Sequence, residues 1–253
     1  MKSILRKWSL VALVCFGGAL FAVEPQDAKA LYESGMRFYD EKNYSEALKY
    51  FRPAAELGYA PAQSRLGWCY HRAFGLPRQD RELAVFWFRR AAKQGDTEGQ
   101  YLLGDCYESA FGVPRDLKQA EFWYRKAAEQ GYARAQCSLG GLYISAEHGL
   151  REDHQQMVYW YRKAAEQGYA YGQLDLGRCY EWGLGVPRDP EQAAFWYRKA
   201  AEQGNARGQF ALGECCRDGK GVPKDLAQAA FWFRKAAAQG SGKAQRALNK
   251  LGY

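Results

Sequence analysis

Apolar residues recur with helical spacing along most of the chain, in paired segments separated by short loops that contain glycine and proline. Ala84, Phe88 and Ala91, for example, fall on one stripe of a helical wheel, and Trp87 lies at the edge of that stripe. The segment before them carries a matching apolar stripe. One pair of helices cannot bury such stripes alone, whereas stacked pairs share an elongated core. The pattern therefore predicts an all-α protein built from stacked helix pairs.

A ten-residue phrase, FWYRKAAEQG, ends each pair. It stands unchanged at 122–131 and 195–204, and variants occupy 49–58, 86–95, 159–168 and 231–240. The final glycines are 36 or 37 residues apart, a period typical of solenoids of helix-turn-helix repeats. The period predicts about six repeats and a C-terminal capping helix: 28–60, 61–96, 97–132, 133–169, 170–205, 206–241 and the cap at 242–253. We expect the charged residues of the cap on its outer side.

Each second helix is predicted to begin at an aspartate and to end at a glycine. Four of the aspartates are followed three residues later by a glutamine, which is the spacing of a capping box. These pairs are Asp116 and Gln119, Asp153 and Gln156, Asp189 and Gln192, and Asp225 and Gln228. Asp80 has Leu83 in place of the glutamine, so we expect only the aspartate half of the capping box there. The final glycines are predicted to close the helices in the left-handed conformation.

The N-terminal segment, residues 1–22, has the composition of a secretory signal peptide. Three basic residues, Lys2, Arg6 and Lys7, precede an apolar run over residues 8–23, which at 16 residues is shorter than the roughly 20 that span a bilayer. We expect cleavage after Ala22, with Ala30 as a second candidate. Residues 23–253 are then one repeat domain without a transmembrane span.

Composition and charge narrow the function classes. The chain is 47% apolar and 25% charged, which is typical of a globular protein and not of a disordered one. The formal net charge of +8 becomes +5 when the signal peptide is removed. A moderately basic exported protein favours acidic partners or anionic envelope surfaces over nucleic acid. Alternatively, the basic pairs in the last turns of the second helices only complement the helix dipoles.

The repeat resembles that of a known family. The segments GQLDLGRCY (172–180), GLGVPRD (183–189) and AAFWYRKAAEQG (193–204) follow the pattern of the Sel-1-like repeat, a relative of the tetratricopeptide repeat. The resemblance covers about residues 61–240, and residues 28–58 look more like a tetratricopeptide unit. It implies an all-α, right-handed superhelical solenoid that binds other proteins and has no shared catalytic residues. Bacterial members are often exported and are associated with envelope biogenesis, host interaction, peptidoglycan turnover and the neutralisation of toxic effectors.

Cysteines occupy one equivalent position in four of the first helices: Cys69, Cys106, Cys179 and Cys215. Leu142 stands there in another repeat, which indicates a small apolar filler. Packed helices place equivalent positions about 8–10 Å apart, farther than the roughly 7 Å that a disulfide spans. Free thiols are therefore favoured, and a bridge stays open because export permits it. A cysteine-rich subfamily of the resembled family, linked to penicillin binding, joins its paired helices by disulfides, but this sequence has alanines where the second thiol would stand.

The sequence gives little support for catalysis or for a cofactor. The histidines, His71, His148 and His154, have no second metal ligand at helical spacing. No serine lies in a nucleophile elbow, and the glycine loops lack the Lys-Ser/Thr ending of a phosphate-binding loop. We therefore expect a protein that is not an enzyme and that needs no metal and no cofactor.

Non-core positions of the first helices are the candidate partner site. The residues two before and two after the leucine of the Leu-Gly pair are predicted to point away from the core stripe. Large or charged residues at or near these positions are predicted to line a groove on the concave face: Trp68, Tyr101, Leu174, Arg178, Trp182 and Phe210. The alternative is that these side chains pack against adjacent repeats.

Two further sets of residues recur once per repeat. The aromatic rings that open the phrase are predicted to seal the joints between second helices: Phe86, Phe122, Tyr159, Phe195 and Phe231. Glutamines near the core edge are predicted to hydrogen-bond along the stack: Gln63, Gln100, Gln136, Gln173 and Gln209.

The sequence thus predicts an exported, monomeric, non-catalytic scaffold, periplasmic or secreted, that binds a protein or peptide in its concave groove. Envelope processes and interactions with a host or competitor are the expected settings. An alternative from another class is an enzyme or glycan binder that acts on the cell wall or on β-lactams. A third possibility is an immunity protein that neutralises a secreted toxin. The sequence does not choose the partner.

Overall fold

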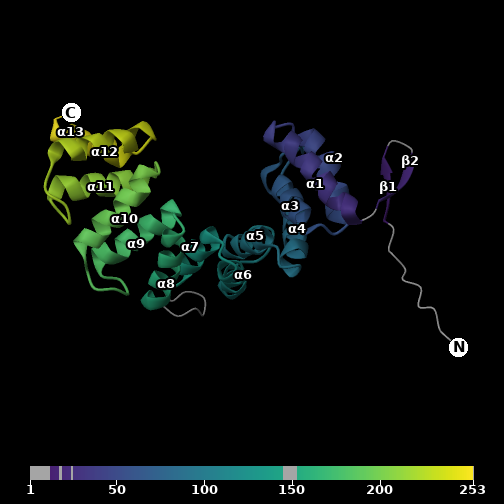
Figure 1. Ribbon diagram of the computed structural model, residues 1–253, viewed down its shortest axis with the longest axis horizontal. Coiled ribbons are helices and arrows are strands. Elements are labelled where there is room, and N and C mark those ends of the chain that lie inside the picture. The colour runs from purple at the N-terminus through teal and green to yellow at the C-terminus, as the bar shows by residue number, and fades with distance from the viewer. Residues whose placement is uncertain (1–11, 17–18, 24, 145–152, 253) are drawn as a thin grey trace. The chain divides into compact units, whose positions relative to one another are not determined.

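The computed structural model describes residues 12–16, 19–23, 25–144 and 153–252 of the chain. In these residues, thirteen α-helices follow a short hairpin (Figure 1). The chain divides into two compact units, residues 1–115 and 116–253, which are described separately below. A solenoid divides readily because each repeat contacts only its neighbours.

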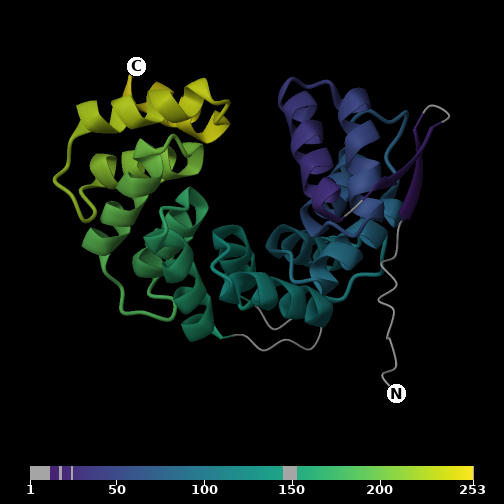
Figure 2. The same cartoon turned by 45° about the vertical axis from the view of Figure 1, so that its right-hand side comes forward.

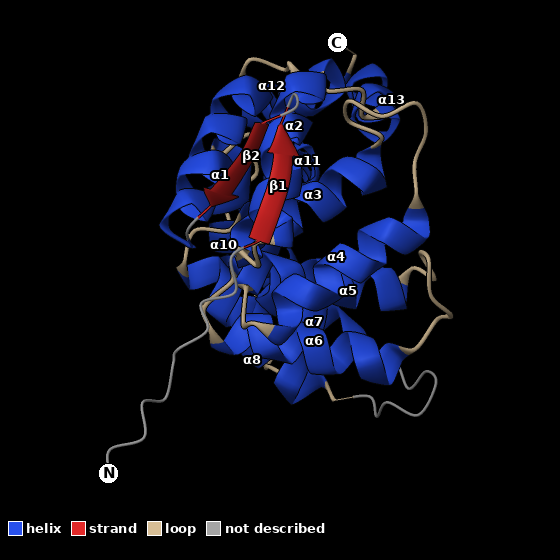
Figure 3. Cartoon of the chain, turned by 90° about the vertical axis from the view of Figure 1, so that its right-hand side faces the viewer, coloured by secondary structure: helices blue, strands red, loops and turns tan. Residues whose placement is uncertain are grey.

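The hairpin precedes the repeats. Strands β1 (Ala12–Phe16) and β2 (Ala19–Val23) pair antiparallel, with Ala12 opposite Val23 and Phe16 opposite Ala19 (Figure 3). It lies partly in the segment predicted to be a signal peptide, and the all-α prediction missed it. Two apolar runs on either side of a Gly-Gly pair match a hairpin pattern as well as a signal sequence. The all-α solenoid is confirmed for the repeats themselves.

Unit 1 continues with five helices, and those adjacent in sequence pack against each other. They are α1 (Pro25–Asp40), α2 (Tyr44–Glu56), α3 (Ala60–Arg72), α4 (Arg81–Lys93) and α5 (Thr97–Glu108). Phe51, Leu66 and Cys69 are buried together in the core at the start of the unit. The helix pairs therefore bury their apolar stripes against one another, as the pattern predicts.

Unit 2 contains eight helices that also pack in sequence order (Figure 2). They are α6 (Leu117–Glu129), α7 (Ala133–Leu142), α8 (His154–Glu166), α9 (Ala170–Trp182), α10 (Pro190–Glu202), α11 (Ala206–Asp218), α12 (Leu226–Ala238) and α13 (Gly242–Leu251). The first helices α7 and α9, and likewise α9 and α11, contact each other directly. Neighbouring second helices in the described part of this unit have no comparable contact. The first helices are thus the more closely packed layer.

The aspartate caps are confirmed. The Asp189 carboxylate accepts a hydrogen bond from the Gln192 amide at 3.0 Å. The Asp80 carboxylate accepts one from the Leu83 amide at 3.0 Å. The amide of Asp189 donates to the Tyr180 carbonyl oxygen at 2.9 Å, so a bond to the preceding helix takes the place of the second half of the capping box.

Glycines act at two recurring places. Gly204 and Gly240, at the ends of phrases, have φ of 86° and 88°, which confirms the left-handed closure of the second helices. Gly177, in a Leu-Gly pair, has no room for a side chain. A Cβ there would stand 2.7 Å from the Tyr197 ring, so the glycine lets α9 and α10 approach closely.

The glutamine ladder along the stack is confirmed. Gln173 donates to the Ala165 carbonyl oxygen of α8 at 3.3 Å, and its own side-chain oxygen accepts from Gln203 of α10 at 2.7 Å. Gln136 and Gln209 make the corresponding bonds in their repeats. Each of these first-helix glutamines is buried, and paired amides avoid the cost of burying a polar group without a partner. The ladder therefore ties three successive helices together.

Candidate functional site

The six residues predicted to line the groove fall in both units. Trp68 and Tyr101 are half-buried on α3 and α5 of unit 1, and the other four lie in unit 2. The Trp68 indole stacks on the His71 imidazole with 5.0 Å between ring centroids, and the Arg72 guanidinium lies 5.5 Å from the Trp68 ring. Because Trp68 is engaged by neighbours on and beside its own helix, the candidate site is built from unit 2.

Leu174 lies in the core. Its side chain is 1% exposed and is buried with Leu212 and Ala193 in the apolar cluster of the C-terminal repeats. The prediction that Leu174 lines a solvent-facing groove is wrong, because α9 contacts both α7 and α11 and this position is covered. A helical wheel gives the direction of a side chain from its own axis, and it does not show which directions a neighbouring helix occupies.

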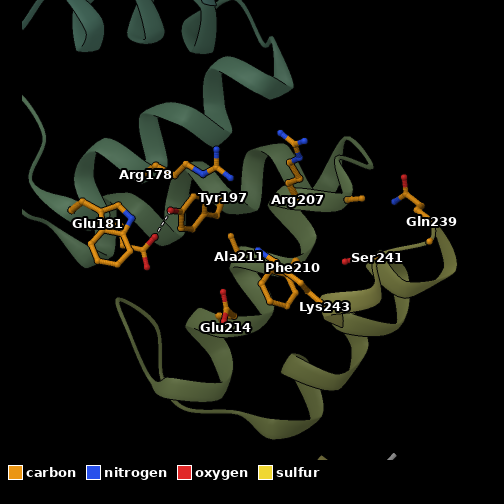
Figure 4. Close-up of a pocket in the computed structure, with 13 residues that line it drawn as sticks. Arg178, Glu181, Tyr197, Arg207, Phe210, Ala211, Glu214, Gln239, Ser241 and Lys243 are labelled. Carbon is orange, nitrogen blue, oxygen red and sulfur yellow. Dashed lines mark hydrogen bonds between the residues drawn. The ribbon is translucent and has the colours of Figure 1, made fainter. Parts of the chain in front are cut away.

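Arg178, Trp182 and Phe210 come together in one open pocket of about 730 Å³ in unit 2 (Figure 4). The first two residues lie on α9 and the third on α11. Tyr197 of α10 also lines the pocket, and Lys243 of α13 closes one end together with the turn before that helix. The structure therefore brings half of the predicted residues to one place, and their role in binding stays a prediction.

Two aromatic side chains give the pocket its apolar surface. Trp182 ends α9 and is 70% exposed, more than any other large apolar residue in the described part of the chain. Phe210 is half-buried, and its ring centroid lies 5.5 Å from that of Phe233 in the core. Phe210 is therefore held in place by its contact with the core, whereas the Trp182 side chain is largely exposed to solvent at the rim of the pocket.

A buried tyrosine links the pocket to the second helix of the same repeat. The Tyr197 hydroxyl donates to the Glu181 carboxylate at 2.5 Å and so ties α10 to α9. Burial, and then the hydrogen bond to Glu181, raise the pKa of Tyr197 well above its usual range. The tyrosine stays neutral, and its hydrogen bond fixes the position of the Glu181 carboxylate on the wall of the pocket.

The pocket carries charges of both signs. Arg178 forms an ion pair with Asp175 at 3.0 Å, and Glu214 forms one with Arg217 at 3.5 Å. Partial burial raises the pKa of Glu214, and the nearby guanidinium of Arg217 opposes that shift. Arg207 is exposed, and its charge is one of those that oppose the rise in the pKa of Asp175 caused by burial. The polar lining can therefore hold charged groups of a ligand while the two rings contact apolar ones.

Reactive groups are few in the described part of the chain. No group of three or more His, Cys, Asp or Glu side chains lies there in a position to hold a metal ion, and His148 falls outside that part. The six described cysteines are free thiols. Burial raises the pKa of the four in equivalent positions to about 12: Cys69, Cys106, Cys179 and Cys215. Buried, protonated thiols are poor nucleophiles, and these fit the interpretation as core filler.

The aromatic rings that open the phrase do not seal the joints between second helices. Each is 44% to 48% exposed: Phe86, Phe122, Tyr159, Phe195 and Phe231. In α10, the Phe195 ring meets the Trp196 ring edge-on at 5.1 Å between centroids, and the Lys199 ammonium lies 5.6 Å from the Phe195 ring. The prediction is wrong because neighbouring second helices do not pack closely, so the rings contact their own helix.

Sequence reasoning missed the other residues of the pocket, among them Glu181, Tyr197, Arg207 and Lys243. A signal existed for Arg207 and Lys243, which stand two residues before a glutamine of the ladder register. The residue at this position varies between repeats: Pro61, Glu98, Arg134, Tyr171, Arg207 and Lys243. Variation at a surface position of a repeating scaffold is where a specific contact is expected. Tyr197 had no such signal, because its position in the phrase is aromatic in every full repeat.

Known proteins share this fold and sequence pattern. The Sel1 repeat matches residues 28–59, 60–96, 97–132, 133–169, 170–205 and 206–241. The crystal structure of a Sel1 repeat protein from Oxalobacter formigenes is 31% identical, with a TM-score of 0.78 over 88% of this chain and 90% of that chain. A second structure is that of c5321, a protective antigen present in uropathogenic Escherichia coli strains displaying an SLR fold. It is 37% identical, with a TM-score of 0.77, and the match covers 91% of this chain and 50% of that chain.

A more distant structure is that of the immunity protein Pa5087 from Pseudomonas aeruginosa. It is 21% identical, with a TM-score of 0.55 over 85% of this chain and 83% of that chain, and at this identity the likeness concerns the fold alone. None of the curated protein sequences matches the chain.

Proposed function

Because the chain belongs to the Sel1 repeat family, whose repeats typically serve as protein-interaction scaffolds, we propose that it is a non-catalytic scaffold that binds a protein or peptide segment in the pocket between α9, α11 and α13. The observation that carries the proposal is that the exposed Trp182 and the anchored Phe210 line the same open pocket, which has charged walls. Exposing a large ring to water is unfavourable, and aromatic residues with arginine are the usual anchors of protein interfaces.

The lining of this pocket supports binding over catalysis. Its one closely coupled pair, Tyr197 and Glu181, is a neutral hydroxyl that donates to a carboxylate, with the pKa of the tyrosine raised. Such a pair holds no deprotonated nucleophile. The remaining charged groups are spaced along an open surface that does not exclude water, whereas acid–base chemistry gains most in an enclosed site.

The proposal includes export to the periplasm or the exterior as a monomer. Its support is the basic and apolar composition of residues 1–22. Separately, no helix in the described part of the chain has the length and hydropathy to cross a membrane. Fractionation of cells that express the full chain, with N-terminal sequencing of the mature protein, tests this part, and recovery of the uncleaved chain in the cytoplasm would contradict it.

The binding proposal is tested by selection from an unbiased library of displayed peptides against the purified protein. The affinities of enriched peptides are then measured by fluorescence polarisation for the wild type and for Trp182→Ala. We expect the variant to weaken binding by about 2 kcal/mol or more, because a few large anchors carry most of the energy of an interface.

The matched control is Phe195→Ala, which removes an exposed ring from α10 outside the pocket. It should leave affinity unchanged. Failure to enrich any peptide, or an affinity that does not depend on Trp182, would contradict the proposed function.

A further inference from the structure

The C-terminal helix α13 carries its charges on a single face. Lys243, Arg246 and Lys250 stand at i, i+3 and i+7, which places them on one stripe of the helix. Lys243 lines the pocket, and all three line an adjoining depression of about 210 Å³ beside Phe210. No acidic residue occurs in α13. The three side chains are exposed, and the cap therefore presents a row of positive charge next to the candidate site.

Part of this row is unfavourable for the helix that carries it, because only Lys250, in the last turn, complements the helix dipole. Like charges three or four residues apart destabilise a helix. Lys243 also stands in the first turn, at the positive end of the helix dipole, where a cation is disfavoured. The other exposed positions carry Gln245 and Asn249, whose side chains hydrogen-bond to each other at 3.1 Å. A cap that only confers solubility would gain more from mixed charges, so the row points to an anionic ligand.

The neighbouring helix α11 extends the positive surface. Arg207 has the same place in its repeat as Lys243 has in the cap, so the two cations lie one repeat apart along the stack. In Figure 4, Lys243 lies beside Phe210, and Arg207 extends away from it. All four cations are exposed and have no ion pair with a carboxylate in the described part of unit 2: Arg207, Lys243, Arg246 and Lys250. Their charge is available to a partner, unlike that of the paired Arg178.

We propose that the partner of this pocket is an acidic peptide segment with an apolar side chain. The apolar side chain packs against Phe210 and Trp182, and the flanking carboxylates lie over the cations of α11 and α13. The inference rests on the proposed function, because it specifies the ligand of the same pocket. Charge complementarity carries it: the pocket and the depression beside it offer two aromatic rings and exposed cations that form no ion pair in the described part of unit 2.

Three fluorescent peptides test the inference. All contain a central Leu-Phe pair, which is flanked by glutamates, by glutamines or by lysines. We expect the glutamate peptide to bind about tenfold more tightly than the glutamine peptide and to lose this advantage as the salt concentration rises. The lysine peptide should bind most weakly.

Charge reversal gives the decisive comparison. The variant Lys243→Glu/Arg246→Glu/Lys250→Glu should lose the preference for the glutamate peptide and bind the lysine peptide instead. The control variant Lys118→Glu/Lys126→Glu/Lys224→Glu makes the same change in net charge at exposed positions outside the pocket and should retain the wild-type preference. Replacement of the three α13 cations by glutamine provides a milder variant, and circular dichroism verifies that each protein is folded.

The outcomes separate the inference from the proposed function. If library peptides bind in a Trp182-dependent manner but the glutamate peptide binds no better than the glutamine peptide, the inference fails and the proposed function stands. If no peptide binds, both fail. If a single-stranded oligonucleotide or an anionic phospholipid vesicle binds as tightly as the glutamate peptide and does not depend on Trp182, the cations recognise any polyanion, and the acidic-peptide inference is overturned.

Discussion

Replacement of Tyr197 by phenylalanine isolates the hydrogen bond that links the pocket wall to the second helix. The Tyr197 hydroxyl donates to Glu181 at 2.5 Å, and the ring itself is buried. Phenylalanine already stands at the same position of the phrase in three other repeats, as Phe51, Phe88 and Phe233, and all three are fully buried there. The substitution should therefore keep the packing and remove only the bond.

The expected cost follows from the surroundings of the two groups. A hydrogen bond to a charged group contributes about 1.5–3 kcal/mol. Glu181 is half-exposed, so its freed carboxylate regains water and the cost falls towards the lower end. We expect Tyr197→Phe to lower the free energy of unfolding by about 1.5 kcal/mol. It should also weaken binding of the glutamate peptide modestly, because a carboxylate is released into the pocket.

Tyr161→Phe is the matched control. Tyr161 is buried at the same position in the preceding repeat, where no hydrogen-bond partner of its hydroxyl is found in the described part of the chain. Urea unfolding followed by circular dichroism should give a loss within about 0.5 kcal/mol for this variant. Equal losses for the two variants would refute the reasoning, because the cost would then come from the aromatic position and not from the bond to Glu181. A double-mutant cycle with Glu181→Ala should assign the difference to the pair.

Three further predictions concern the scaffold. Leu174→Ala should lower the free energy of unfolding in urea by about 3 kcal/mol, because it opens a cavity in the core. Trp182→Ala should lower it by less than about 0.5 kcal/mol, because the ring is exposed. Similar losses for the two variants would contradict the burial of Leu174 and the exposure of Trp182. Gln173→Leu should cost about 2 kcal/mol by removing two hydrogen bonds of the ladder, and a loss near zero would show that the ladder adds no net stability. Folding raises the thiol pKa from 9.0 to about 12 at four cysteines: Cys69, Cys106, Cys179 and Cys215. Their contribution to stability is therefore complete below about pH 9 and is lost as the pH rises towards 12, which melting temperatures across this range check. If these thiols are free, denatured and unreduced protein should be alkylated at every one of the four.

The sequence alone determined the repeat, the helix pairs and their ends. Each of these depends on local chemistry that is written into consecutive residues. The Asp189 side chain caps the amides that follow it, and Gly204 adopts a left-handed conformation that other residues avoid. The stripe of Ala84, Phe88 and Ala91 is buried because every helix of a stack buries its apolar side. Such features repeat with the sequence, so the sequence suffices to predict them.

The tertiary structure decided which non-core positions are covered. Leu174 and Phe195 both lie off the core stripes of their helices, yet Leu174 is buried and Phe195 is exposed. The difference arises because neighbouring first helices pack more closely than neighbouring second helices in the described part of unit 2, and a helical wheel carries no information about that spacing. The pocket follows from the same contacts: they bring Trp182 and Phe210 into one pocket and place the charged face of α13 next to Phe210. A site formed by side chains of several helices depends on the distances between those helices, and these distances are fixed only when the repeats have packed.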